Sequence, residues 1–259
     1  MKYRYWLMVF IGLLCVSTPS FSGETLKLEA DYWMPYTGDG HAEVGYAVEL
    51  VKAIFKKQGI RVVYQEVPWA RAISDARDGK CDGVIGAMVS EVPGFVLPHE
   101  VIGRSVQEFY VKRGSAWKYT GIESVKGIRL GVIKNYSYFP GLDAYINTNS
   151  NQIHFGFGDH PMTDSLIPML IRGRIDAVID DRAVIRYDLK RMGLDREFVA
   201  AGIGDEVQNS YIAFAPGNAK SPQYARMLSA GIIALRKTGE LKKILSHYGL
   251  SDWERGGAS

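Results

Sequence analysis

Two segments of the chain carry nearly the same sequence, and this repeat restricts the folds that are possible. Residues 79–85 read Gly-Lys-Cys-Asp-Gly-Val-Ile, and residues 173–179 read Gly-Arg-Ile-Asp-Ala-Val-Ile. Each segment follows a helical pattern and ends in a β-branched pair that suits a strand. The spacing exceeds the roughly 20–50 residues of a solenoid repeat and fits two similar α/β lobes. Small ligands bind preferentially between domains, so the cleft between the lobes is the expected site.

The apolar pattern predicts parallel strands with intervening helices in both halves of the chain. Alternating or β-branched runs predict strands, and apolar residues on one helical face predict the helices. The first half is predicted to contain strands at 26–30, 61–64 and 84–85 and helices at 47–55 and 70–78. This βαβαβ order is typical of a parallel sheet covered by helices.

The second half repeats this order, and the chain then returns toward the first. A buried strand is predicted at 128–133 and another at 175–179, with a helix between them that contains Pro168 in its first turn. Extended segments at 108–111 and 210–214 lie where the chain would leave the first lobe and re-enter it. The remainder is predicted to form the helices 224–237 and 241–248.

The N-terminus predicts export across the inner membrane. Lys2 and Arg4 precede an apolar run over residues 6–16, and small residues lead to Ser22. This order predicts a signal peptide over residues 1–22, cleaved near Ser22, and a periplasmic protein. A lipoprotein signal at Cys15 is the alternative, although Leu14 stands where a small residue is expected.

Composition excludes several other classes of protein. Loss of Lys2 and Arg4 lowers the formal net charge from +3 to +1, and the remaining basic residues form no stripe, so we expect no nucleic-acid partner. Removal of Cys15 leaves Cys81 without a disulfide partner, and an apolar context predicts that it is buried. The five histidines are scattered and no metal, nucleotide or nucleophile motif occurs, so no cofactor is expected.

Four motifs resemble those of one protein family. Residues 45–50 match its Gly-Phe-Asp-Val-Asp-Leu, residues 79–85 its Gly-Lys-x-Asp, and residues 175–181 its Asp-Ala-Val-x-x-Asp, while residues 235–241 are typical of its C-terminal helices. The chain therefore resembles the family 3 extracytoplasmic solute-binding proteins, the polar amino-acid-binding components of ABC transporters.

The resemblance implies a fold and partners. The fold is the two-lobed α/β periplasmic binding protein fold (type II), in which each lobe is a mainly parallel sheet flanked by helices. Lobe 1 is predicted to contain residues 23–103 and 212–259, and lobe 2 residues 108–207, with hinge strands at 103–107 and 207–211. The expected partners are a small-molecule ligand and an inner-membrane ABC permease or sensor receptor, and the protein is expected to be a monomer.

The same resemblance assigns aromatic and acidic residues to the cleft. Trp69 aligns with the family's stacking aromatic, and Trp33 follows the first strand in the same way. Asp181 aligns with the aspartate that accepts hydrogen bonds from the α-amino group of the ligand. The alternative for Asp180 and Asp181 is capping of the next helix. Asp31 is a second candidate acid, with a loop cap as its alternative.

The carboxylate side of the family site is altered. Residues 89–94 align with the family's Ser/Thr-x-Thr-x-x-Arg, and Ser90 in this stretch is a candidate ligand-binding residue. Glu91 stands at the family's Thr position, and Gly94 replaces the Arg that clamps the ligand carboxylate. In the second lobe Asn135 and Tyr136 replace a Gly-Thr pair, although backbone N–H groups there can still bind an anion. A free α-amino acid therefore lacks its usual partners.

Two arginines are candidate substitutes for the clamp. Arg71 lies two residues after Trp69, and Arg104 lies beside the first crossing segment; surface salt bridges are the alternative for both. If neither points inward, the site is net acidic and suits a cation or polyamine-like ligand between aromatic rings. The sequence predicts a binding protein for an amine-bearing solute, not an enzyme. The alternatives are a sensor component or an exported dehydratase, with Glu91 as its acid–base group.

Overall fold

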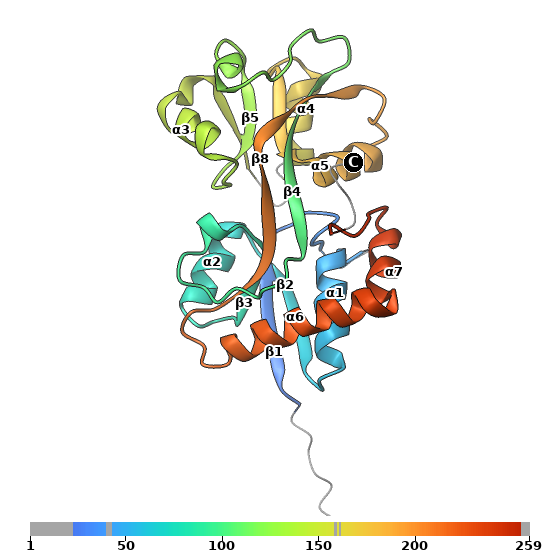
Figure 1. Ribbon diagram of the computed structural model, residues 1–259. Helices are drawn as coiled ribbons and strands as arrows, with labels where there is room; N and C mark the ends of the chain where they lie inside the picture. The colour runs from blue at the N-terminus through green and yellow to red at the C-terminus, as the bar shows by residue number, and fades with distance from the viewer. Residues whose placement is uncertain (1–22, 40–42, 158–159, 161, 255–259) are drawn as a thin grey trace, which may run out of the picture.

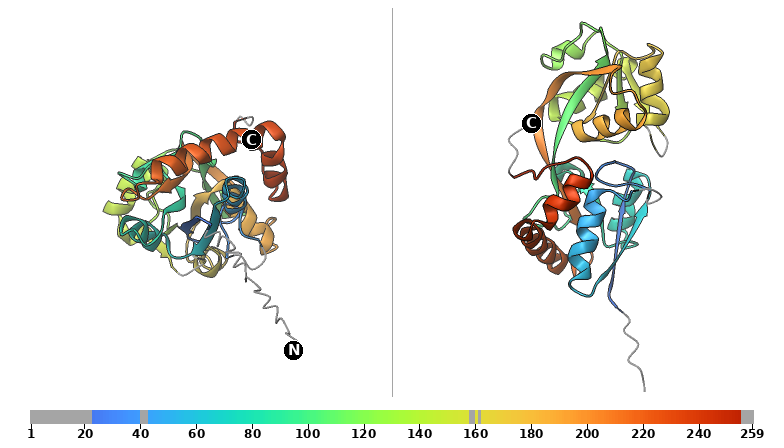
Figure 2. Two further views of the ribbon diagram at one scale, coloured as in Figure 1. Left: turned by 90° about the horizontal axis from the view of Figure 1, so that it is seen from below. Right: turned by 90° about the vertical axis from the view of Figure 1, so that its right-hand side faces the viewer.

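The structure is a computed structural model that describes residues 23–39, 43–157, 160 and 162–254. It consists of two lobes joined by two long strands, β4 and β8 (Figure 1 and the right-hand view of Figure 2). The predicted signal peptide lies outside the described residues. Within the described ranges, no helix has the length and apolar character needed to span a membrane.

Eight strands form one hydrogen-bonded sheet that runs through both lobes in the order β2-β1-β3-β8-β4-β7-β5-β6. The strands are β1 (Thr25–Ala30), β2 (Arg61–Glu66), β3 (Gly83–Ala87), β4 (Gly103–Lys112), β5 (Leu130–Ile133), β6 (Ile153–Gly156), β7 (Ala177–Asp181) and β8 (Phe198–Phe214). β1 is parallel to β2 and β3, and β5 is parallel to β6 and β7. Each lobe therefore contains the predicted parallel strands, and the antiparallel strands β8 and β4 join the two groups into one sheet.

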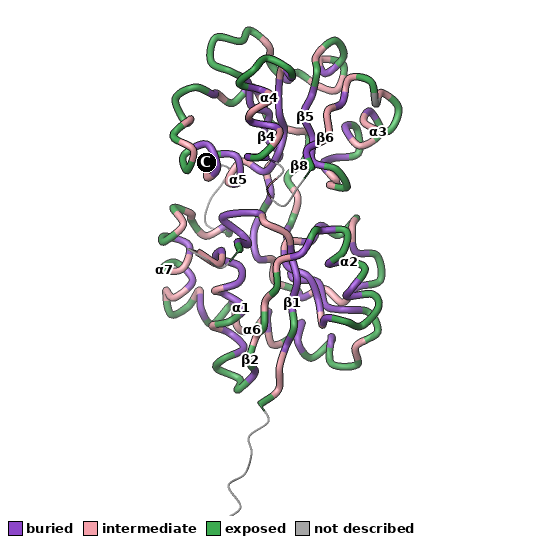
Figure 3. Tube along the Cα trace, turned by 180° about the vertical axis from the view of Figure 1, so that it is seen from behind, coloured by how far each residue is buried: buried purple, intermediate pink, exposed green. Residues whose placement is uncertain are grey.

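Helices cover both faces of the sheet in each lobe. They are α1 (Tyr46–Lys56), α2 (Trp69–Arg77), α3 (Pro140–Thr148), α4 (Ile167–Ile171), α5 (Arg182–Arg191), α6 (Ser221–Thr238) and α7 (Glu240–His247), with short helical turns η1 (Val89–Glu91), η2 (Ile122–Val125), η3 (Ser150–Gln152) and η4 (Met162–Leu166). One core of the first lobe packs against α1, α6 and α7 and another against α2. The cores of the second lobe lie toward α3 and toward α4 and α5. Strands that are buried on both faces explain the continuous apolar runs in the sequence (Figure 3).

The strands β4 and β8 connect the lobes as an antiparallel pair. Residues 211–214 of β8 pair with β3 of the first lobe, whereas residues 198–210 pair with β4. β4 also pairs with β7 of the second lobe. The segments predicted as hinge strands lie within this pair, and their role as a hinge remains a prediction.

Most element boundaries differ from the predictions by a few residues, and α3, α5 and β6 were not predicted. α2 begins at Trp69 itself, and β8 begins at Phe198, twelve residues before the predicted segment. Pro168 is the second residue of α4, as expected for a first turn, but α4 directly continues the π-helical turn η4. Cys81 is a free, buried thiol just before β3.

Candidate functional site

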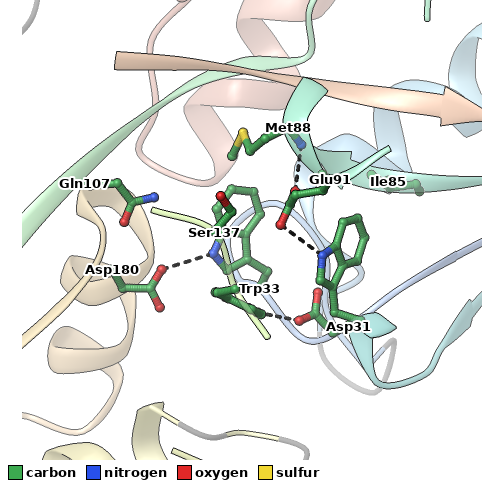
Figure 4. A pocket seen from close by; sticks show the side chains of 11 residues that line it. Asp31, Trp33, Ile85, Met88, Glu91, Gln107, Ser137 and Asp180 are labelled. Carbon is green, nitrogen blue, oxygen red and sulfur yellow. Dashed lines mark hydrogen bonds between the residues drawn. The ribbon is translucent and has the colours of Figure 1, made fainter. Parts of the chain in front are cut away.

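A small pocket lies between the two lobes, close to the crossing strands (Figure 4). Its lining residues are Asp31, Trp33, Trp69, Ile85, Gly86, Met88, Glu91, Gln107, Tyr136, Ser137 and Asp180. Its volume of about 30 Å³ leaves room for about two water molecules. A second cavity, of about 1060 Å³, is also lined by residues of both lobes, among them Tyr36, Arg104 and Asp181.

The ends of parallel strands bring these residues together. Asp31 and Trp33 follow β1, Glu91 ends the turn after β3, and Tyr136 follows β5. Trp69 begins α2 directly after β2. The carboxyl ends of parallel strands meet at one edge of a sheet, which is where open α/β sheets bind ligands. In this protein two such edges face each other across the pocket.

Three carboxyl groups in the pocket each accept a hydrogen bond from an aromatic side chain. The pairs are Trp33 Nε1 to Asp180 Oδ1 (3.4 Å), Trp69 Nε1 to Glu91 Oε1 (3.1 Å), and the Tyr136 hydroxyl to Asp31 Oδ2. The first and third pairs join one lobe to the other. The pocket thus combines three acids with the faces of three large rings.

Burial disfavours the ionised form of all three acids. It raises the pKa of Asp31 to about 7, with a hydrogen bond from Tyr136 acting in the opposite direction and the negative charges of Glu91 and Glu66 adding to the rise. Burial also raises the pKa of Glu91, although bonds from the Met88 N–H and Trp69 oppose it. The pKa of Asp180 lies well above its usual range for the same reason.

Two acceptor atoms in this pocket are left without a partner among the described residues. Asp180 is 1% exposed, and its Oδ1 accepts from the Asp181 N–H at 2.6 Å and from Trp33, while Oδ2 has no donor. Gln107 is 4% exposed, and its Oε1 likewise has none. Buried acceptors are nearly always satisfied, so a donor from a water molecule or from a ligand can bond to these two atoms.

The pocket contains five of the nine predicted site residues. They are Asp31, Trp33, Trp69, Glu91 and Tyr136. Arg71 lies outside the pocket, with 66% of its side chain exposed and a 3.2 Å ion pair from Nε to Asp75. Ser90 and Asn135 are exposed and do not line it, and Asn135 has a positive φ of 67°. The other candidate clamp, Arg104, is also exposed and outside.

Asp181 lies outside the pocket, and its neighbour Asp180 lies inside. Asp181 Oδ1 accepts from the N–H groups of Ala183 (2.8 Å) and Val184 (3.3 Å) and so caps α5. Its Oδ2 accepts from the Val106 N–H at 3.1 Å and from the Tyr36 hydroxyl at 3.3 Å. These bonds match the helix-capping alternative. Both carboxylate oxygens of Asp181 already accept hydrogen bonds, so neither is free to bind the amino group of a ligand.

Sequence reasoning missed Asp180, Gln107 and Ser137 as lining residues, together with the apolar Ile85 and Met88 and the glycine Gly86. The available signal for Asp180 was the pair of neighbouring acids, Asp180 and Asp181, at the end of the second copy of the repeat. Side chains of neighbouring strand residues point to opposite faces, so only one of the two acids can enter the pocket. Gln107 lies in a crossing strand and carries no motif.

The charge of this pocket differs from that of a carboxylate-binding site. Among the described residues that line it, none is Lys, Arg or His. No group of three or more His, Cys, Asp or Glu side chains in the described part of the chain is placed to hold a metal ion. The arrangement can accept hydrogen bonds from a cation and stack aromatic rings against it.

Comparison with known proteins supports this picture. Residues 29–93 match the model of the bacterial extracellular solute-binding proteins, family 3. A probable amino-acid-binding protein, YxeM of Bacillus subtilis (strain 168), is 21% identical over 267 residues, which cover 96% of each chain. These matches confirm the predicted resemblance to the family 3 solute-binding proteins.

Solved structures share the fold. One, from work on glutathione import via GshT and the cystine ABC importer TcyBC of Streptococcus mutans, has a TM-score of 0.73 at 19% identity and covers 90% of this chain and 99% of its own. A histidine kinase sensor domain with similarity to periplasmic binding proteins has a TM-score of 0.72 at 20% identity, with 87% and 96% covered. The fold is the two-lobed fold of periplasmic binding proteins.

Proposed function

We propose that this protein is an exported solute-binding protein that captures a small amine-bearing solute between its two lobes. The observation that carries the proposal is this interlobe pocket, which has one buried acid, Asp180, two partly buried acids, Asp31 and Glu91, three aromatic rings and no basic side chain among its described lining residues. A buried carboxylate strongly favours a cationic donor, because an unpaired buried charge is costly.

The solute is expected to close the two lobes because it contacts both walls of the pocket. Asp31, Trp69 and Glu91 come from the first lobe, whereas Tyr136 and Asp180 come from the second. A ligand drives closure only to the extent that it binds the closed form better than the open one. A solute held between these walls has contacts that exist only when the lobes are together.

The closed protein would deliver its solute to an inner-membrane ABC permease. The relative's description as an amino-acid-binding protein and the likeness to a protein studied in ABC import support this partner. The likeness to a histidine kinase sensor domain favours a second candidate, in which the closed form is presented to a sensor. Loss of uptake of the labelled amine after deletion of the gene would favour import, and loss of a transcriptional response alone would favour sensing.

A thermal-shift screen of amino acids, amines and organic acids tests the binding function. A ligand at about 100 times its dissociation constant stabilises the folded state by about 2.7 kcal/mol. For a chain of this size, that should raise the melting midpoint by roughly 5–10 °C. Amine-bearing compounds should give the shifts and be recovered unchanged after incubation. A screen in which only amine-free acids or neutral solutes give shifts, or in which the amine is converted, would contradict the proposal.

A further inference from the structure

We infer that the solute is a dication without a carboxylate: a small molecule with a cationic nitrogen at each end, such as a diamine or an aminoalkylguanidine. This rests on the proposed function and names the class of ligand for the same pocket. Acidic groups lie on both walls of the pocket, so one cationic end can be held by each lobe. Figure 4 shows Asp180 and Gln107 on one side and Asp31 and Glu91 on the other.

The wall at the second lobe offers two unpartnered acceptors. Asp180 Oδ2 and Gln107 Oε1 are buried and have no donor within the described part of the chain. The orientation of the Gln107 amide follows from its neighbour: Gln107 Nε2 donates to Ser105 Oγ at 3.2 Å, and the Ser105 hydroxyl itself bonds to the Asp181 carboxylate. An ammonium or guanidinium group has several N–H donors and can serve both acceptors.

The wall at the first lobe carries two further acids. Glu91 is held in place by the Met88 N–H at 2.8 Å and by Trp69 Nε1, while the Tyr136 hydroxyl occupies Asp31 Oδ2. Because Tyr136 belongs to the opposite lobe, its bond to Asp31 breaks when the lobes open. A second cationic end can then replace that hydroxyl at Asp31, with the indole of Trp69 beside it.

A carboxylate on the solute would have no partner here. The pocket has no described basic lining residue, and Arg71 and Arg104 lie outside it. A carboxylate placed beside an ionised acid in a partly buried site is repelled by it. An α-amino acid therefore binds less well than the same molecule without its carboxylate.

Matched pairs of compounds test this directly, because each pair differs only by one carboxylate. Titration calorimetry at pH 8 should compare agmatine with arginine and cadaverine with lysine. We expect at least one decarboxylated compound to bind, and to bind at least tenfold more tightly than its parent amino acid. If arginine or lysine binds as tightly as its partner, the dication assignment is wrong while the proposed function stands. If no amine binds but an amine-free solute does, both are wrong.

Variants locate the cationic end. Asp180→Asn keeps the shape of the side chain and removes the acidic acceptor, so we expect agmatine affinity to fall at least tenfold. Asp188→Asn is the matched control, because Asp188 is also an aspartate with 1% exposure but lies on α5 outside the pocket. A single cooperative melting transition for each variant, with a midpoint no lower than that of the parent protein, establishes that they fold. An equal loss of agmatine affinity in both variants, or no loss in Asp180→Asn, would contradict the placement of a cationic end of the solute at Asp180.

Discussion

The protonation of Asp31 makes the stability of the ligand-free protein depend on pH. Its pKa of about 7 lies above the 3.8 of an unburied aspartate, because burial, together with Glu91 and Glu66, outweighs the bond from Tyr136. Between these two pH values the folded state keeps a proton that the unfolded state has lost. The contribution of Asp31 to stability is therefore favourable at low pH and decreases as the pH rises from about 4 through about 7.

The variant Asp31→Asn should consequently be more stable than the parent protein at pH 8, by on the order of 4 kcal/mol, and almost equally stable near pH 4. Amine binding should weaken in the same variant, since it loses an acidic acceptor. Chemical denaturation at the two pH values measures the first effect and calorimetry the second. Asp205→Asn is the control, because Asp205 also accepts from a tyrosine, Tyr119, but is exposed. A uniform loss of stability in Asp31→Asn at both pH values would contradict this assignment.

The location of single residues in the pocket was predictable where a strand end fixes it. Asp31, Trp33 and Tyr136 follow predicted strands, and the structure places all three in the pocket. The choice between Asp180 and Asp181 was not predictable, because it depends on which face of β7 meets the cleft. A shift of one residue exchanges the two faces.

At the scale of elements, the start of α1 fixes the loop that carries Trp33. Gly45 precedes the helix with φ 87° and ψ 144°, a region that is almost restricted to glycine. The N–H groups of Tyr46 and Ala47 donate to Pro35 O (2.9 Å) and Tyr36 O (3.1 Å). A Cβ at Gly45 would lie 2.3 Å from the carbonyl oxygen of Tyr36.

Gly45→Ala should therefore lower the free energy of unfolding by about 2–4 kcal/mol, from backbone strain and overpacking together. Because the loop must move, amine affinity should fall as well. Gly59→Ala is the matched control: it also has a positive φ, 73°, but nothing lies within 4 Å of the added Cβ. Gly59→Ala should lower the free energy of unfolding by about 1 kcal/mol and leave amine binding unchanged. Equal losses for the two variants in urea titrations would show that the contact with Tyr36 has no effect.

The elements themselves differ in how well the sequence predicts them. Helices and parallel strands with a buried face leave a periodic pattern, and most were predicted within a few residues. β8 was predicted only over its last residues, because residues 205–207 are exposed. Hydrogen bonds to β4 hold that part of the strand, and backbone pairing leaves no apolar pattern in the sequence.

At the scale of the whole molecule, side chains of the two lobes hold the closed form together. Trp33 with Asp180, Tyr36 with Asp181 and Tyr187 with Glu43 (3.1 Å) are hydrogen bonds between residues more than 140 positions apart in the chain. The repeat predicts two lobes and a cleft, but not which side chains meet across it. Those contacts depend on how the lobes are placed by β4 and β8.

Proton release on binding tests the central claim, capture of a cation by buried acids, most directly. Titration calorimetry with agmatine at pH 7, in two buffers that differ in ionisation enthalpy, counts the protons exchanged. The pKa of Asp31 is raised to about 7, so this acid is partly protonated at pH 7 before binding, and the pKa of Asp180 is raised in the same direction; a cation favours the ionised acids. We expect a net release of protons to the buffer and tighter binding at pH 8 than at pH 6. Binding with no proton exchange, or with proton uptake, would contradict cation capture by these acids.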